Sequence, residues 1–154
     1  MTGQGSPPLD ADEFERWSAS AAQTLGAADD LAGLGHHGLA CFQAEQAAQL
    51  CVKALLRGVG TPSFGHDLVD LAGRLAKAVV ADLPDDMRTA MTRLSRHYVA
   101  TRYPDAWTAG TPAQHYGAAD SRGALDDAAV VLAAIRNAWE QLLVAGNEEG
   151  GDAR

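Results

Sequence analysis

One stretch, residues 39–57, constrains the fold more than any other. It contains neither Gly nor Pro and is rich in Ala, Leu and Gln, a composition that favours helix. Apolar side chains fall on almost every side of that helix, which is typical of a central helix with neighbours on several faces. One polar stripe interrupts them, because Gln46, Gln49 and Lys53 recur at three- and four-residue spacings and share a face. The stretch therefore predicts a helical domain built around one central helix.

Amphipathic patterns predict four further helices. Apolar residues spaced by three or four indicate helices over about 12–34, 67–81, 84–103 and 120–143. Asp12 is the expected N-cap of the first, and Pro104 should end the fourth, because the residue before a proline is pushed out of helical geometry. Short connections place successive helices antiparallel. We therefore predict an all-α fold, an up-and-down antiparallel bundle of four to five helices without a sheet.

The 154 residues are expected to form one domain. Residues 1–11 are rich in Gly, Ser and Pro and predict a disordered tail. The bundle should span residues 12–144, and the Gly- and Glu-rich end, 145–154, should be a flexible tail. Residues 105–117 form a long loop without periodicity, and a loop of that length in a compact domain is either functional or mobile.

The composition of the chain indicates where in the cell the protein should lie and whether it should bind a metal. No apolar run approaches the roughly 20 residues that span a bilayer, and no basic segment precedes an apolar core at the N-terminus, so we expect a cytoplasmic protein without membrane attachment. Cys41 and Cys51 are about 15 Å apart along one helix, too far for a disulfide, and should be buried as small hydrophobes. No Cys/His cluster has zinc spacing, so neither a metal nor a cofactor is expected.

Charge is unevenly distributed along the chain. The net charge of −8 argues against non-specific binding of nucleic acid, which needs Lys and Arg at the phosphates. Residues 51–102, however, hold eight basic and five acidic side chains, 8 − 5 = +3, against 4 − 15 = −11 for the rest. The middle of the chain could therefore hold a small anion, or it could simply carry segregated surface charge.

Three short pieces of sequence carry a family resemblance. They are Phe42 with Gln46-Ala47 and Lys53-Ala54-Leu55-Leu56, then His66-Asp67-Leu68, then Arg102-Tyr103-Pro104-Asp105. In this order they resemble HEPN domains, the nucleotide-binding domains of higher eukaryotes and prokaryotes, over roughly residues 13–143. The resemblance implies a helical bundle, frequent homodimers, a nucleotide or RNA ligand, and a nucleotidyltransferase encoded as a separate partner chain.

Five residues are candidates for binding a ligand. Arg102, with Tyr103 beside it in the matched piece, could hold a phosphate or carboxylate in a cleft; alternatively it satisfies the last carbonyls of its helix. His66, at the mouth of the third helix, could act as an acid or base or bind an anion, or it could only cap and pack. Lys53 and Gln46 would form a polar cleft wall or merely the wet face of the central helix.

A catalytic pair is the remaining question. In HEPN families that cut RNA, an arginine and a histidine follow each other at a set spacing on one helix: arginine stabilises charge on the phosphorane, and histidine moves the proton of the 2′-hydroxyl. No pair here has that spacing, although Arg93 and His97 share a helix face. We therefore favour a non-catalytic module that binds a nucleotide, another small anion or a partner. The alternatives are a metal-independent ribonuclease toxin of a toxin–antitoxin pair and a structural homodimerisation module.

Overall fold

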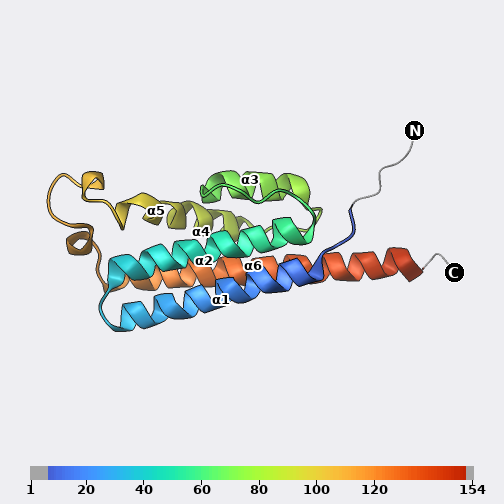
Figure 1. The fold of residues 1–154 in the computed structure, drawn as a ribbon, viewed down its shortest axis with the longest axis horizontal. Helices are drawn as coiled ribbons and strands as arrows, with labels where there is room; N and C mark the ends of the chain where they lie inside the picture. The colour runs from blue at the N-terminus through green and yellow to red at the C-terminus, as the bar shows by residue number, and fades with distance from the viewer. Residues whose placement is uncertain (1–6, 152–154) are drawn as a thin grey trace.

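The computed structural model describes residues 7–151, and they are mostly helical (Figure 1). In chain order the elements are α1 (Ala11–Gly33), α2 (His37–Gly58), α3 (Leu68–Ala78), α4 (Asp85–Ser95), the single-turn α5 (His97–Ala100), two 3₁₀ turns (Pro104–Ala106 and Pro112–His115) and α6 (Ala118–Gly151). No strand occurs within this range. The predicted all-α fold is confirmed.

Helix α2 is the centre of the bundle. It packs against α1, α3, α4 and α6, and its buried residues come from nearly every side of the helix. Cys41 and Cys51 are buried free thiols within it. Burial raises the pKa of both thiols to about 12, so they behave as small hydrophobes, as predicted.

Four of the helices alternate in direction. Glu13, near the start of α1, pairs with Arg57, near the end of α2, so these two helices are antiparallel. Arg93, near the end of α4, pairs with Asp127, in the first part of α6, so these two helices are also antiparallel. Figure 1 shows α1, α2, α4 and α6 lying side by side along the long axis of the molecule. They form the predicted up-and-down bundle.

Helix α3 departs from the antiparallel expectation. The connection over residues 59–67 runs back along α2, since Arg57 bonds Ser63 and Gln49 bonds the carbonyl of His66. Helix α3 therefore starts beside the middle of α2 and runs parallel to it (Figure 1). A connection of this length can reach about 30 Å when extended, which is enough to retrace three turns of α2 instead of reversing the chain.

The first helix begins earlier than predicted. Asp10 rather than Asp12 is its N-cap, and the Asp10 carboxylate accepts a hydrogen bond from the backbone N–H of Glu13 at 3.0 Å. Leu9 packs against the core, and the N–H of Asp10 donates to the carbonyl of Gly58. The predicted disordered segment 1–11 thus includes ordered residues at its end, while residues 1–6 lie outside the described range.

The predicted helix over 84–103 is two helices. Helix α4 ends at Ser95, whose hydroxyl donates to the carbonyl of Thr92 at 2.7 Å. Arg96 separates the two helices and keeps helical backbone angles, φ −65° and ψ −21°, and α5 begins at His97. At the other end of the chain, α6 continues to Gly151. The predicted flexible tail, 145–154, is therefore helical as far as the described residues extend, because helical hydrogen bonds are local and no proline interrupts them.

Helix α6 is also long and apolar enough to cross a membrane, by length and composition alone. Its apolar side is buried in the bundle through Ala128, Val131, Ile135 and Trp139. Core helices of globular proteins pass the same test, and packing inside the bundle accounts for these four side chains, whereas Leu143 and Val144 further along α6 are exposed.

Candidate functional site

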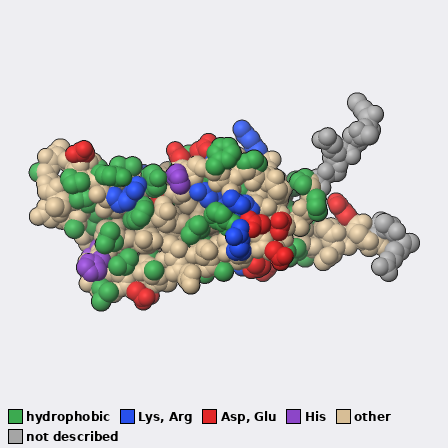
Figure 2. Space-filling model, viewed as in Figure 1, with side chains coloured by type: hydrophobic (Ala, Val, Ile, Leu, Met, Phe, Trp, Pro, Cys, Tyr) green, Lys and Arg blue, Asp and Glu red, His purple; other side chains and the backbone are tan. Residues whose placement is uncertain are grey.

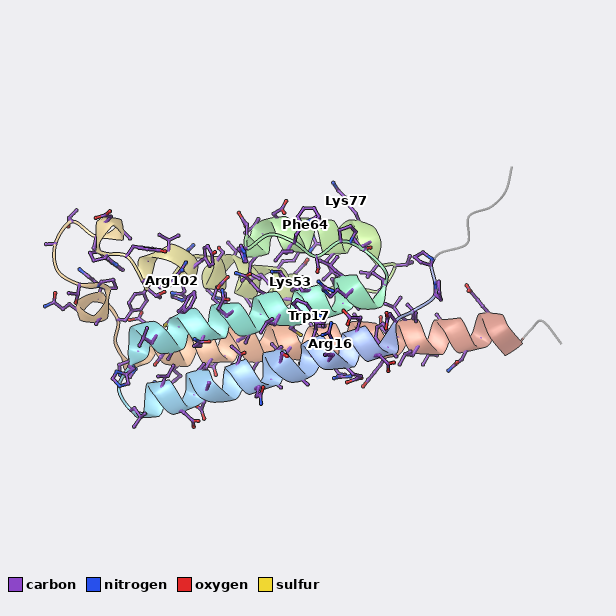
Figure 3. All side chains as sticks on the ribbon, viewed as in Figure 1. Arg16, Trp17, Lys53, Phe64, Lys77 and Arg102 are labelled. Carbon is purple, nitrogen blue, oxygen red and sulfur yellow. The ribbon has the colours of Figure 1, made fainter. Side chains whose placement is uncertain are left out.

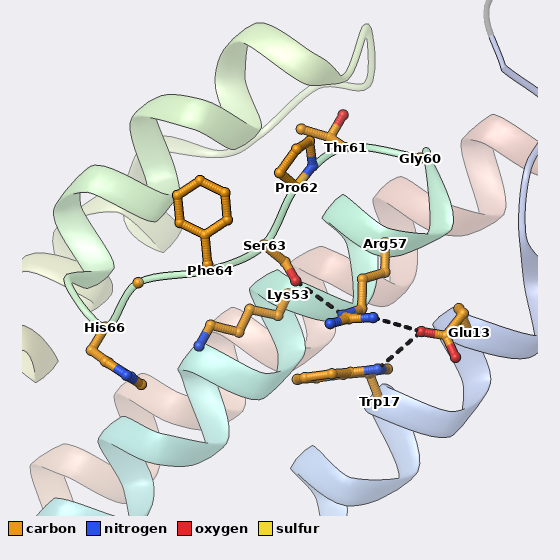
Figure 4. Close-up of a pocket in the computed structure, with 11 residues that line it drawn as sticks. Glu13, Trp17, Lys53, Arg57, Gly60, Thr61, Pro62, Ser63, Phe64 and His66 are labelled. Carbon is orange, nitrogen blue, oxygen red and sulfur yellow. Dashed lines mark hydrogen bonds and ion pairs between the residues drawn. The ribbon is translucent and has the colours of Figure 1, made fainter.

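A cleft of about 670 Å³ lies where the segment after α2 turns back over α1 and α2 (Figure 4). Gly60 and Gly65 bound the segment that forms one wall of it, and both have positive φ, +75° and +103°. Glycine adopts that conformation without steric cost. The lining side chains include Glu13, Trp17, Lys53, Arg57, Phe64 and His66.

At one end of the cleft Arg57 is held on three sides. Its Nη1 donates to Glu13 Oε2 at 3.0 Å and its Nε to the Ser63 hydroxyl at 3.0 Å. Its guanidinium carbon lies 4.2 Å from the centroid of the Trp17 ring, and Trp17 itself donates to Glu13 at 3.2 Å. Arg57 is therefore an immobilised cation whose charge is shared with Glu13.

Lys53, one turn before Arg57, is the cation that a ligand could use. Its side chain is half-buried, and it has no ion-pair partner within residues 7–151. Figure 4 shows no hydrogen bond from it to the other lining residues. Burial lowers the pKa of Lys53, and the charge of Glu45 partly opposes that effect. Because an unpaired ammonium in a partly dry cleft favours a negative neighbour, this side chain is suited to bind an anion.

Beneath the cleft lies a buried carboxylate. Glu45 is 0% exposed, and it accepts hydrogen bonds from Gln46 Nε2 at 2.8 Å and from Gln49 Nε2 at 2.6 Å. Burial raises the pKa of Glu45, and the two amide hydrogen bonds and the charges of Arg102 and Lys53 act against that rise. Gln46 thus supports Glu45 rather than lining the cleft.

Glu45 should make stability depend on pH. The pKa of Glu45 is higher in the folded chain than its ordinary value of 4.5, so between those two values the folded state binds more protons than the unfolded state. The free energy of unfolding then falls as pH rises above about 4.5 and levels off above the folded pKa. Glu45→Gln has no titratable group at this position. The melting temperature of the variant, relative to that of the parent, should therefore rise as pH increases from about 4.5 to the folded pKa of Glu45.

The exposed Glu140 provides the matched control. Melting temperatures of the parent, Glu45→Gln and Glu140→Gln should be measured from pH 4 to pH 8. A Glu45→Gln difference that stays constant across the series would contradict a raised pKa for Glu45.

His66 and Arg102 lie on different parts of this face. His66 lines the cleft together with Lys53. Arg102 lies nearer the end of the bundle that carries the loop after α5 (Figure 3), where it lines a separate hollow with Thr101 and Thr111. Its Nε donates to the carbonyl of Tyr98 at 2.8 Å, which is the helix-terminal role that the sequence left open.

Three aromatic rings surround Arg102. The centroids of Phe42, Tyr98 and Tyr103 lie 4.6, 4.6 and 5.0 Å from its guanidinium carbon. The structure therefore brings Lys53 and His66 into one cleft and leaves Arg102 and Tyr103 outside it.

The Arg93 and His97 pair does not form a shared site. Arg93 lies in α4 and His97 begins α5, and Arg93 binds Asp127 with both Nε (2.9 Å) and Nη2 (2.7 Å). His97 faces the Tyr116 hydroxyl at 3.4 Å, and burial lowers the pKa of His97. Both side chains nevertheless face the same part of α6, because Arg93 binds Asp127 and the charge of Asp127 also acts on His97.

Sequence reasoning missed Trp17, Phe64 and the role of Arg57. Trp17 fits the apolar stripe of the first helix, and Phe64 lies in a loop without periodicity. The only signal in the sequence was the four-residue spacing of Lys53 and Arg57, which places both on one face of α2. Figure 2 shows Lys and Arg side chains gathered in the middle of this face, with acidic side chains next to them.

Comparisons with known proteins agree with this architecture. The family model of the HEPN domain matches residues 14–139. The structure is similar to that of TT1696 from Thermus thermophilus, with a TM-score of 0.77 and 36% identity over 80% of this chain and 96% of that one. It is also similar to ST0689, an archaeal HEPN homologue, with a TM-score of 0.67 and 28% identity over 80% and 95%. No protein with curated function matches the sequence.

Proposed function

Because this chain belongs to the HEPN domain family, we propose that it is a non-catalytic module that binds a nucleotide or another small phosphorylated anion. The binding site is the cleft between α1, α2 and residues 59–67. The observation that carries the proposal is Lys53, a half-buried ammonium without an ion-pair partner in the described part of the chain, in a cleft that Trp17 and Phe64 also line (Figure 4).

The cleft suits a phosphorylated ligand with an aromatic or sugar portion. Lys53 supplies a charged donor for a phosphate oxygen, and charge-assisted hydrogen bonds of this kind are the strong ones. The Phe64 ring is 77% exposed, so it offers a face on which a base could stack. Arg57 is held by Glu13, which also pairs with Arg16, and by Ser63, whereas Lys53 has no such partner in the described part of the chain and is the proposed main anchor.

The non-catalytic part of the proposal rests on the state of Arg93 and His97. Transition-state stabilisation needs an arginine aimed at the reacting phosphate, whereas the Arg93 guanidinium is engaged bidentately by Asp127. The imidazole of His97 is half-buried against Tyr116. Both arrangements support a binding role over a ribonuclease role.

Lys53→Met should abolish most of the binding. A hydrogen bond to a charged group contributes about 1.5–3 kcal/mol, which corresponds to a loss of roughly tenfold to a hundredfold in affinity. Calorimetric titration of ATP and AMP into the parent and the variant measures this directly.

Lys77→Met is the matched control, because Lys77 is exposed on α3 and points away from the cleft (Figure 3). Equal affinity of the Lys53 and Lys77 variants would show that the ligand does not bind in this cleft. Saturable ligand binding should also raise the melting temperature of the parent; absence of both signals with every nucleotide tried would contradict the proposal.

Homodimerisation is a second candidate role, favoured by apolar side chains exposed beside the cleft. Val69 and Val99 are 52% and 50% exposed and line a neighbouring groove of about 540 Å³ between α3 and α5. We propose that a second copy of the chain covers them. Light scattering at micromolar concentration should then give twice the monomer mass of 16.1 kDa, and a monomer would exclude it. A separate nucleotidyltransferase partner stays a prediction from the family resemblance.

A further inference from the structure

The orientation of one buried amide is determined by its neighbours. Gln49 is 2% exposed, and its Nε2 lies 2.6 Å from Glu45 Oε1 and 2.9 Å from the backbone carbonyl of His66. A backbone carbonyl only accepts hydrogen bonds, so the NH₂ group of Gln49 must face the carbonyl of His66, and Glu45 Oε1 lies on the same side of the amide. This turns Gln49 Oε1 toward the ring of His66.

That orientation determines which nitrogen of His66 carries the proton. Gln49 Oε1 lies 3.3 Å from His66 Nδ1, and an amide oxygen can only accept. Nδ1 must then be the donor, and a neutral imidazole carries one ring proton. Nε2, on the far side of the ring from Nδ1, is left with a lone pair. The ring is also stacked on Tyr98, with centroids 5.8 Å apart and planes 10° apart, so its direction is set on two sides.

We infer that Gln49, oriented by Glu45 and the His66 carbonyl, is a positioning residue that selects the Nδ1–H tautomer of the His66 imidazole and presents Nε2 as a hydrogen-bond acceptor at the cleft. The inference deepens the proposed function and rests on it for the ligand. Lys53 donates to an anion, and His66, which lines the same cleft, accepts from a donor. The ligand that matches both is a phosphate ester with a hydroxyl group near the phosphate, as in a sugar phosphate or the ribose of a nucleotide.

The tautomer can be measured on the intact parent protein. Long-range ¹H–¹⁵N correlation spectra of the five histidines, recorded at pH 8 and assigned with His66→Gln, distinguish a protonated from an unprotonated ring nitrogen. We expect protonated Nδ1 and unprotonated Nε2 at His66. A predominant Nε2–H tautomer in the parent would overturn the inference without any variant having to fold.

Gln49→Met tests the positioning role, because it keeps an unbranched side chain of similar length and removes the acceptor. The His66 signals should move toward the Nε2–H tautomer in this variant. Gln43→Met makes the same change on the same helix, at a half-buried position, and should leave the His66 signals unchanged. An unaltered tautomer in Gln49→Met would show that Gln49 does not set it.

The ligand class is tested with two phosphates. The parent should bind ribose 5-phosphate about fivefold more tightly than methyl phosphate, which lacks the hydroxyl, in keeping with one hydrogen bond. Gln49→Met should lose that preference and keep its affinity for methyl phosphate. If neither phosphate binds although ATP or AMP does, the proposed function stands and the assigned ligand class is wrong. Equal binding of the two phosphates would also contradict the ligand class, and the spectra decide the tautomer in every case.

Discussion

Phe14→Ala should lower the free energy of unfolding by about 4 kcal/mol, as expected for a large aromatic side chain removed from a packed core. Phe14 is fully buried, and its ring stacks on Trp139 with centroids 4.2 Å apart and planes 11° apart. The pair joins α1 to α6 against the end of α2, so the substitution leaves a cavity where three helices meet. Stacked aromatic pairs also contribute beyond the area they bury.

Phe64→Ala is the matched control for this prediction. The Phe64 ring is 77% exposed, and the guanidinium carbon of Arg74 lies 5.3 Å from the ring centroid. Its removal should change the free energy of unfolding by less than about 0.5 kcal/mol. Urea unfolding of both variants and the parent gives the comparison. Similar losses in the two variants would mean that the junction of Phe14 and Trp139 does not dominate the core.

The second large effect concerns Gly58, the last residue of α2. A Cβ placed there would lie 2.7 Å from Cζ3 of Trp139 and 3.2 Å from Cβ of Phe14. Neither contact is with the end of a flexible chain, because both atoms belong to the stacked pair. Gly58→Ala should therefore destabilise the protein by about 2 kcal/mol through overpacking, even though alanine is the better helix former.

Gly26→Ala should have the opposite effect on stability. Gly26 lies inside α1 and would have no atom within 4 Å of an added Cβ. The helix propensity of alanine should then stabilise the protein by up to about 1 kcal/mol. Thermal or urea unfolding of the two glycine variants measures both effects. Stabilisation by Gly58→Ala would show that Trp139 can move away and that the close approach of α2 and α6 is not required.

Gly58 also shows that the end of a helix can be predicted correctly while part of the reason for the glycine is missed. The stretch predicted as the central helix, residues 39–57, stops just before Gly58, a residue type that commonly ends helices, and α2 does end at Gly58. The structure adds that the position is buried beneath Trp139, so glycine is needed for the packing of α2 against α6 as well as for the end of the helix. Periodicity within one helix carries no information about a ring contributed by another helix much later in the chain.

The sequence by itself determined the helices, the central place of α2 and the family. Helical hydrogen bonds join residues four apart, so the spacing of apolar side chains along α2 or α6 predicts each helix without knowledge of the others. An error appeared at the start of α1, where a single side chain, the Asp10 carboxylate, decides the boundary. The same local logic placed Gln46, Gln49 and Lys53 on one polar face.

Only the tertiary structure decided which polar residues share a site. The cleft exists because residues 59–67 turn back along α2, and that path is held by bonds between distant residues, Gln49 to His66 and Arg57 to Ser63 and Glu13. Those contacts bring His66 and Trp17 to Lys53 and leave Arg102 outside, and they enclose Glu45. A spacing pattern describes one helix at a time, whereas a site is formed where separate segments meet, and the free energy that joins those segments comes from burial and hydrogen bonds that no local pattern contains.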